Sequence, residues 1–300
     1  MRIKINGEEI YYRRQGKGKT FLLLHGNMSS SLFFKRTMEE IDDFDFVAPD
    51  MRGFGNSSYR QKSDRIEDYV SDMKELILYL DLQHFHILGW SFGGGVVMKL
   101  LEDREMASRI DEVVFLSSMG NVGITKARRD EDYFNFLLPL HKMSLYEPSS
   151  MKGFFNSMNL PFAKEWTSKI PFFWKELEFY SKEEIEKRLI ENVFRKYLYD
   201  RKLPSKTEYD RNIKEALKQR NFYEVNQMIG HFSEKTKKLP QKIYHILHGT
   251  EDIVIRPEIA KHLAAELRGK LILFPYCGHS LMTDDFEHYR LYLDKLRRSL

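Results

Sequence analysis

The segment Gly-Trp-Ser-Phe-Gly at residues 89–93 constrains the fold of this chain more than any other feature. It comes directly after the apolar run Phe85–Leu88 and directly before a helical run that begins with Gly94. A serine with glycines two positions away on each side is typical of a sharp strand-to-helix turn, because glycine lets the backbone close up without clashes. Such a turn lifts the Ser91 hydroxyl above the sheet and points the helix N-terminus at developing negative charge. The segment therefore predicts a serine nucleophile on an α/β sheet.

The same segment is compatible with two other interpretations. One is an ordinary strand-to-helix turn without chemistry. The other is a phosphate-binding loop, but no Gly-Lys-Ser/Thr ending follows, and the next strand carries its acids Asp111 and Glu112 at its start rather than at its end. The nucleophile interpretation is favoured.

Short apolar runs alternate with helical patterns over most of the chain. The predicted strands are residues 3–5, 9–13, 20–24, 45–48, 85–88, 112–116, 242–247 and 270–274. The predicted helices are residues 32–41, 66–82, 92–102, 257–267 and 285–300. Alternation of this kind indicates βαβ units and a mostly parallel sheet, whereas Asn6-Gly7 predicts an antiparallel hairpin at the start.

The alternation stops over residues 121–240, which are rich in lysine, glutamate and bulky aromatic residues. We interpret this segment as a helical insertion, because a structureless loop of that length is improbable inside a compact domain. The predicted organisation is a core domain of residues 1–120 and 241–300 with a cap of residues 121–240. The aromatic residues of the cap form its own small core and docking face, or they line a substrate pocket.

Charge and cysteine content exclude several classes of protein. The 48 Lys and Arg against 44 Asp and Glu give a net charge of +4, too small for a nucleic-acid footprint without a dense basic stripe. The single cysteine, Cys277, leaves no disulfide or cysteine–zinc cluster and fits a reducing compartment. We also find no apolar run long enough to span a membrane and no secretory signal pattern, so the expected location is the cytoplasm.

Partners for Ser91 come later in the chain, in the order Ser, Asp, His. A serine hydroxyl needs a histidine to take its proton, and the histidine needs an acid to hold its tautomer. Asp252 follows the run 243–247 and His279 follows the run 271–274, so both stand after predicted strands. Because the carboxyl ends of parallel strands share one edge of the sheet, these loops converge there. Glu251 is the alternative acid, and Asp252 is favoured.

A fourth loop completes this predicted site. Residues 22–27, Leu-Leu-Leu-His-Gly-Asn, end another strand in a turn whose backbone N–H groups face the same edge. Acyl transfer needs two N–H donors for the oxyanion, and we expect them to be those of Phe92 and Asn27.

At this point the chain resembles the α/β-hydrolase superfamily. The matching segments, in family order, are residues 24–26 (LHG), 50–57 (DMRGFGNS), 89–94 (GWSFGG), 248–252 (HGTED) and 278–279 (GH). The resemblance implies an eight-stranded, mostly parallel sheet flanked by helices, with a helical cap after strand six. The serine hydrolase mechanism expected for this site requires no cofactor or metal. Serine at the elbow excludes the haloalkane dehalogenase and epoxide hydrolase branches, which carry aspartate there. Residues 25–30 are similar to intracellular polyhydroxyalkanoate depolymerases and general carboxylesterases.

Apolar residues beside the predicted site are candidates for a pocket wall. Phe33, Trp90 and Met119 follow strand ends in the predicted fold, and they either line an apolar pocket or belong to the core.

Three other features of the sequence could also carry chemistry. His84 and His86 have the spacing of a metal pair on a strand, but no third ligand is near, so structural histidines are favoured. Cys277 is a redox-sensitive thiol or, as we favour, a small core residue. Arg52 is expected to fasten the loop after the fourth strand rather than to bind substrate.

These observations predict a serine hydrolase that cleaves a small, apolar carboxylic ester or related acyl bond through an acyl-enzyme. A cofactor-free perhydrolase or a C–C bond hydrolase would use the same three residues. A ligand-binding protein without activity is the alternative from another class, because one fold hosts unrelated functions. The sequence indicates no oligomeric state.

Overall fold

A computed structural model describes residues 1–120, 182–231 and 239–297. Its centre is an eight-stranded sheet with the order β1-β2-β4-β3-β5-β6-β7-β8. The strands are β1 (Arg2–Ile5), β2 (Glu8–Gly16), β3 (Lys19–Leu24), β4 (Phe44–Pro49), β5 (Phe85–Trp90), β6 (Ile110–Leu116), β7 (Ile243–Gly249) and β8 (Lys270–Phe274). The β1–β2 and β2–β4 pairs are antiparallel, and all other pairs are parallel. The predicted fold class is confirmed, and each predicted strand overlaps an observed one.

The inner strands are buried on both faces, which explains why they read as continuous apolar runs in the sequence. Every residue of β4 and β5 is buried. Phe21, Phe44 and Phe46 pack as a cluster with ring centroids 5.3–5.9 Å apart. The hairpin between β1 and β2 turns at Asn6 and Gly7, whose φ angles are +50° and +80°, as a type I′ turn requires. The sheet core thus holds β5 in a fixed position beneath the segment 89–93.

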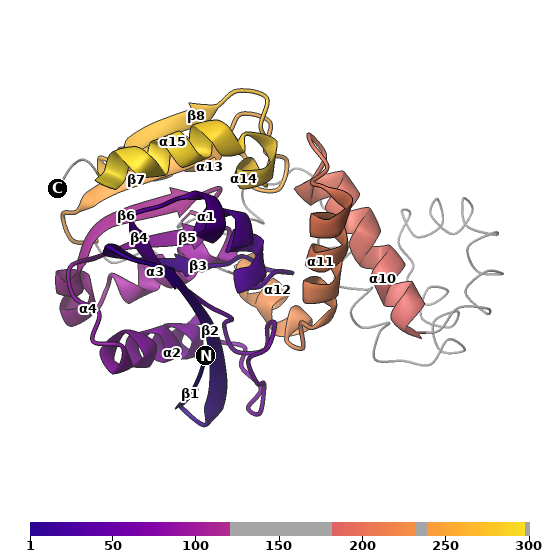
Figure 1. The fold of residues 1–300 in the computed structure, drawn as a ribbon, viewed down its shortest axis with the longest axis horizontal. Coiled ribbons are helices and arrows are strands. Elements are labelled where there is room, and N and C mark those ends of the chain that lie inside the picture. The colour runs from indigo at the N-terminus through magenta and orange to yellow at the C-terminus, as the bar shows by residue number, and fades with distance from the viewer. Residues whose placement is uncertain (121–181, 232–238, 298–300) are drawn as a thin grey trace.

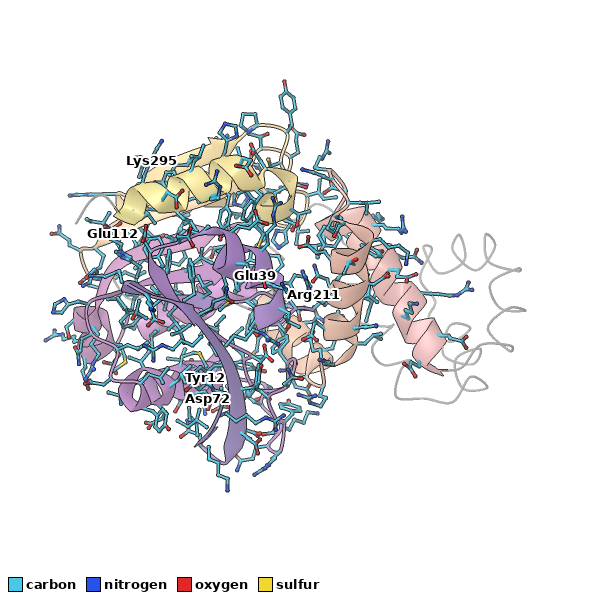
Figure 2. The ribbon with its side chains drawn as sticks, in the orientation of Figure 1. Tyr12, Glu39, Asp72, Glu112, Arg211 and Lys295 are labelled. Carbon is cyan, nitrogen blue, oxygen red and sulfur yellow. The ribbon has the colours of Figure 1, made fainter. Side chains whose placement is uncertain are left out.

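Helices cover both faces of the sheet, and α15 and α2 lie on opposite sides of it (Figure 1). Figure 2 shows the same division at residue level, with Asp72 of α2 on one side and Lys295 of α15 on the other. The helices of this part are η1 (Ser31–Phe34), α1 (Lys35–Glu40), α2 (Ile66–Tyr79), α3 (Phe92–Leu100), α4 (Arg104–Arg109), α13 (Pro257–Leu267), α14 (Leu281–Asp284) and α15 (Phe286–Arg297). One face of α15 is buried, with Tyr289 and Leu293 both at 0% exposure. No described helix is both long and apolar enough to cross a membrane.

Between β6 and β7, the described residues form four further helices, here called the cap helices. They are α10 (Lys182–Val193), the π-helical turn η2 (Phe194–Leu198), α11 (Lys206–Leu217) and α12 (Phe222–His231). In Figure 1, α10 and α11 lie beside one end of the sheet. Residues 121–181 and 232–238 lie outside the described residues, so the aromatic side chains expected there and the boundaries 1–120, 121–240 and 241–300 stay predictions.

Candidate active site

Ser91 occupies the turn between β5 and α3 with a backbone that few residues adopt, φ +52° and ψ −117°. The surrounding glycines permit this turn. A Cβ on Gly89 would lie 2.6 Å from the Cα of Gly94, and one on Gly93 would lie 2.4 Å from the carbonyl oxygen of Leu24. Side chains at these two positions would collide with backbone rather than with movable atoms. The spacing of the sequence motif therefore follows from close contact of β5, α3 and the end of β3.

His279 lies between Ser91 and Asp252. Its Nε2 is 3.0 Å from Ser91 Oγ, and its Nδ1 is 2.8 Å from Asp252 Oδ2. Asp252 comes from the loop after β7 and His279 from the loop after β8. The indole N–H of Trp90 donates to the carbonyl oxygen of His279 at 3.2 Å, which fixes the backbone of the histidine loop against β5. The three side chains are thus brought together at one sheet edge, as the sequence predicted.

Asp252 is held as an anion although it is buried. Burial acts to raise its pKa, but the charge of His279 and the hydrogen bond with it outweigh burial, so the pKa lies below its usual value. Asp252 Oδ1 accepts the backbone N–H groups of Val254 and Ile255, both at 2.8 Å. The neighbouring Glu251 is exposed. Of the two acids in this loop, Asp252 is the one that contacts the histidine.

The predicted oxyanion donors flank the serine. A Cβ on Gly26 would lie 3.0 Å from Ser91 Cβ, so the loop after β3 runs directly beside the nucleophile. Among the described residues, no acceptor is found for the backbone N–H of Asn27 or of Phe92. For Phe92 this follows from its place at the first turn of α3, where helical N–H groups have no partner. Among the described residues, both N–H groups are therefore without a partner.

The loop that carries Asn27 is also tied to the loop after β4. His25 Nε2 accepts the backbone N–H of Met51 at 3.0 Å, and its Nδ1 lies 2.8 Å from the carbonyl oxygen of Gly26. Burial lowers the pKa of His25, which keeps the ring neutral and suited to one donor and one acceptor role. Both ring nitrogens of this histidine thus contact backbone groups, and the ring supports the turn.

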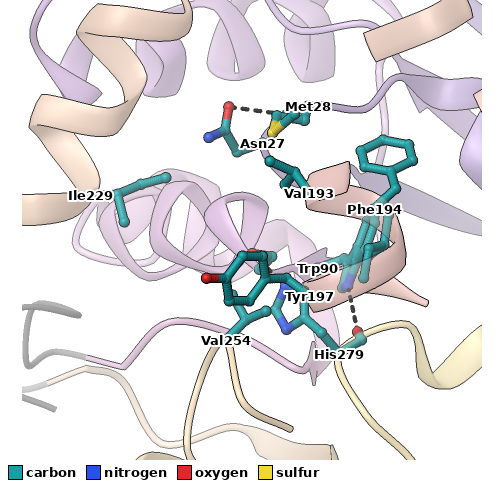
Figure 3. Close-up of a pocket in the computed structure, with 11 residues that line it drawn as sticks. Asn27, Met28, Trp90, Val193, Phe194, Tyr197, Ile229, Val254 and His279 are labelled. Atoms are coloured by element: carbon teal, nitrogen blue, oxygen red, sulfur yellow. Dashed lines mark hydrogen bonds between the residues drawn. The ribbon is translucent and has the colours of Figure 1, made fainter. Parts of the chain in front are cut away.

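A cavity of about 50 Å³ opens onto Ser91 where the cap helices meet the core. Figure 3 shows its lining side chains, which include Tyr197, Val254 and His279. The core residues that line it are Asn27, Met28, Trp90, Ser91, Val254 and His279. The lining residues from the cap helices are Val193, Phe194, Tyr197, Leu198 and Ile229. Its walls are largely apolar, and no Lys, Arg, Asp or Glu stands among these lining residues.

Of the three pocket residues predicted from the sequence, the structure places only Trp90 in the wall of this cavity. Phe33 lies behind the wall, with its ring centroid 5.7 Å from that of Trp90 and 6.1 Å from that of Phe194. Met119 is 1% exposed and lies against Gly95 of α3. Sequence reasoning missed the lining residues of the cap helices, because apolar residues at helical spacing look the same whether they face a core or a cavity.

The histidine pair considered for metal binding is not a pair in space. His84 precedes β5 with φ +49°, so the alternation of a strand does not apply, and its ring is 3.2 Å from Asp111. His86 is buried between Phe21 and Phe44. Within the described ranges, no group of three or more His, Cys, Asp or Glu side chains could hold a metal ion.

Cys277 and Arg52 have the structural environments expected of them. Burial raises the pKa of the Cys277 thiol to about 12, which disfavours the reactive thiolate. Arg52 donates to both carboxylate oxygens of Asp72 at 2.6 Å, and both side chains are buried. This pair fastens the loop after β4 to α2.

Comparison with known proteins places this chain in a family. The sequence model described as alpha/beta hydrolase fold matches residues 19–286. An esterase from Exiguobacterium antarcticum has a TM-score of 0.71 at 20% identity, with 98% of each chain covered. The meta-cleavage product hydrolase of Pseudomonas fluorescens has a TM-score of 0.65 at 20% identity, with 100% of this chain and 97% of that one covered. The chain belongs to the α/β-hydrolase fold family.

Similarity to curated relatives is confined to part of the chain. A soluble epoxide hydrolase from Corynebacterium is 28% identical over 108 residues, which is 35% of this chain and 38% of the relative. A Mycobacterium tuberculosis protein is 27% identical over 117 residues, 39% of this chain and 34% of that one. The chain thus spans a little over a third of the length of these relatives.

Proposed function

We propose that this protein is a serine hydrolase that cleaves a carboxylic ester through an acyl-enzyme. The proposal rests on two linked hydrogen bonds. His279 Nε2 lies 3.0 Å from Ser91 Oγ, and His279 Nδ1 lies 2.8 Å from Asp252 Oδ2. Ser91 lines the cavity, and the backbone N–H groups of Asn27 and Phe92 next to it have no partner among the described residues. An acyl-transfer site requires these parts in this arrangement.

The reaction follows from the positions of these groups. Ser91 Oγ attacks the carbonyl carbon while His279 Nε2 takes the hydroxyl proton, and the carbonyl oxygen gains negative charge between the N–H groups of Asn27 and Phe92. The tetrahedral intermediate expels the alkoxide, which receives the proton from His279, and leaves an ester on Ser91. Water then repeats the attack with His279 as base and releases the carboxylic acid. Asp252 stabilises the imidazolium and keeps Nε2 directed at the serine.

The cavity favours a small uncharged acyl group. Its apolar walls offer no charge to pair with a charged substrate, and burial of an unpaired charge is unfavourable. We therefore propose a small apolar ester as the substrate class. On the basis of the single cysteine we also propose a cytoplasmic location.

A fluorophosphonate probe with peptide mass spectrometry tests the nucleophile. We expect covalent modification at Ser91 in the wild-type protein, and no modification and less than a few per cent of wild-type kcat in Ser91→Ala. The substitution removes one oxygen at a largely buried turn and opens no core cavity, so the melting temperature should be nearly unchanged. Absence of labelling in the wild-type protein would favour a ligand-binding protein without activity.

A second measurement tests the bond that is cleaved. p-Nitrophenyl esters from acetate to decanoate should be hydrolysed with the highest kcat/KM at the short end. Labelling of Ser91 without hydrolysis of any ester in the series would reject an esterase and favour a perhydrolase or a C–C bond hydrolase.

A further inference from the structure

Two side chains from the cap helices and their connection hold the loop that carries Asn27. Gln219 lies between α11 and α12, and Asn226 lies on α12. Gln219 Oε1 accepts the backbone N–H of Met28 at 2.9 Å, and Gln219 Nε2 donates to Asn27 Oδ1 at 2.8 Å. Asn27 Nδ2 donates in turn to Asn226 Oδ1 at 3.2 Å. Three amides therefore join the cap to the loop beside Ser91.

The orientation of all three side-chain amides follows from one hydrogen bond of Asn226. Asn226 Nδ2 donates to the carbonyl oxygen of Phe222 at 2.8 Å, and a carbonyl only accepts. Asn226 must therefore present its oxygen to Asn27 Nδ2, which turns Asn27 Oδ1 toward Gln219 Nε2. Gln219 is left with its oxygen toward the N–H of Met28. A half-turn of any one amide would oppose two donors or two acceptors.

This arrangement gives the backbone N–H groups of Asn27 and Met28 different roles. The N–H of Met28 is occupied twice, by Asn27 Oδ1 at 3.0 Å and by Gln219 Oε1 at 2.9 Å. Figure 3 shows the Asn27 oxygen turned to Met28. Met28 has φ +53°, a left-handed conformation that is unfavourable for a side chain of this size and persists only with outside support. Gln219 supplies that support and leaves the N–H of Asn27 as the free donor.

The connection between α11 and α12 is itself anchored to the core. Asn221 Nδ2 donates to the carbonyl oxygen of Arg52 and to the hydroxyl of Tyr69, both at 2.8 Å. The backbone N–H of Arg220 donates to the carbonyl oxygen of Gly53 at 2.8 Å. Gln219 is therefore presented to the Asn27 loop from a segment that is anchored to the core directly after the glutamine.

We propose that Gln219 is a positioning residue for the oxyanion site, so that docking of the connection between α11 and α12 sets the position of the Asn27 donor. This inference rests on the proposed serine hydrolase activity. A donor that is misplaced still allows substrate to bind in the apolar cavity but binds the tetrahedral oxyanion less well. The residue should therefore affect kcat rather than KM.

Gln219→Met tests the inference, because methionine has a similar length and cannot make either hydrogen bond. The matched control is Lys62→Met, which removes a different contact to the cap helices, the 3.1 Å ion pair with Glu224, through an exposed lysine. Kinetics with p-nitrophenyl acetate are normalised to active sites titrated with the fluorophosphonate, so that a loss of folded protein does not count. We expect Gln219→Met to lower kcat by roughly 10- to 100-fold with KM within about twofold, and the control to keep wild-type values.

Inhibition by a trifluoromethyl ketone distinguishes a positioning role from a purely structural one. The ketone binds Ser91 as a tetrahedral oxyanion, so its Ki reports how well the oxyanion is bound. Its Ki should rise in Gln219→Met by the same factor by which kcat falls. Gln219→Glu retains an acceptor for the N–H of Met28, but it faces Asn27 Oδ1 with a second acceptor and places a negative charge near the oxyanion, so its loss in both quantities should be at least as large. If Gln219→Met fails to fold, Gln219→Glu provides the test instead.

The outcomes separate this inference from the proposed function. Wild-type kcat and Ki in Gln219→Met, or a change confined to KM, would overturn the positioning role while Ser91 labelling leaves the serine hydrolase intact. A wild-type protein that neither reacts with the fluorophosphonate nor binds the ketone would overturn both.

Discussion

Asp252 and Glu251 are adjacent in the sequence, yet their environments are opposite. Asp252 accepts hydrogen bonds from His279 and from two backbone N–H groups, whereas Glu251 is exposed. At the scale of single residues, the network of donors therefore decides which acid orients the histidine.

Asp252→Asn should lower kcat on the order of 10⁴-fold, because an amide stabilises the wrong histidine tautomer. Glu251→Gln should change kcat by less than about threefold, since its side chain does not contact His279. Steady-state kinetics on p-nitrophenyl acetate measures both variants. The reverse ranking would assign the acid role to Glu251.

The raised pKa of Asp284 should make the stability of the protein depend on pH. Burial raises its pKa to about 6, and the charges of Asp200 and Asp252 act in the same direction, while the N–H of Gly278 at 2.7 Å opposes them. The ordinary value is about 3.9, so between about pH 4 and pH 6 the folded state binds more protons than the unfolded state, and stability falls as pH rises.

Asn in place of Asp284 can accept the same N–H without a charge. The melting temperature of Asp284→Asn, relative to wild type, should increase from pH 4 to pH 7, and the gain in unfolding free energy at pH 7 should be roughly 1 kcal/mol after allowance for solvent screening. Asp64→Asn, at an exposed aspartate, is the control with a constant difference. A flat difference for Asp284→Asn across this range would contradict the assignment.

At the scale of elements, the elbow between β5 and α3 is defined by contacts between backbones. A Cβ on Gly89 would lie 2.6–2.7 Å from backbone atoms of Gly93 and Gly94. A Cβ on Gly95 would instead meet Met119 Sδ at 2.9 Å, the end of a flexible side chain. Two glycines of the same region therefore differ in whether their neighbours can move.

Gly89→Ala should lower the free energy of unfolding by about 3 kcal/mol and reduce kcat, because β5 and α3 must separate and carry Ser91 with them. Gly95→Ala should be within about 1 kcal/mol of wild type, since a helix gains from alanine what the shift of Met119 loses. Chemical denaturation compares the two variants. Equal losses would show that backbone crowding at the elbow is not the determinant.

At the scale of the whole molecule, the cavity exists because two parts of the chain meet over the sheet edge. Trp90 and Val254 come from the core, and Phe194 and Leu198 come from the cap helices. Phe194 is 1% exposed and also contacts Phe33 of the core. The size of this cavity is thus set by packing between the cap helices and the core.

Phe194→Ala should enlarge the cavity and raise the ratio of kcat/KM for p-nitrophenyl hexanoate to that for the acetate by roughly tenfold. Val225→Ala truncates a buried residue of α12 that does not line this cavity, and it should leave the ratio unchanged. Both variants are assayed below their melting temperatures. An unchanged ratio in Phe194→Ala would show that the acyl group binds elsewhere.

Local sequence patterns determined much of this protein. The eight strands could be predicted because buried parallel strands read as apolar runs, and the glycines around Ser91 identify a turn whose geometry admits few other residues. The convergence of Ser91, Asp252 and His279 could also be predicted, since each follows a strand and the carboxyl ends of parallel strands share an edge.

Only the tertiary structure decided which side chains shape the cavity and hold the Asn27 loop. Phe194 has a helical, apolar context like that of a core residue, whereas Phe33 and Met119 have equally suitable positions in the sequence but do not line the cavity. Gln219 is 192 positions from Asn27 and belongs to no motif. Which face of a helical segment meets the sheet edge depends on how the whole segment packs, and that information does not reside in any local pattern.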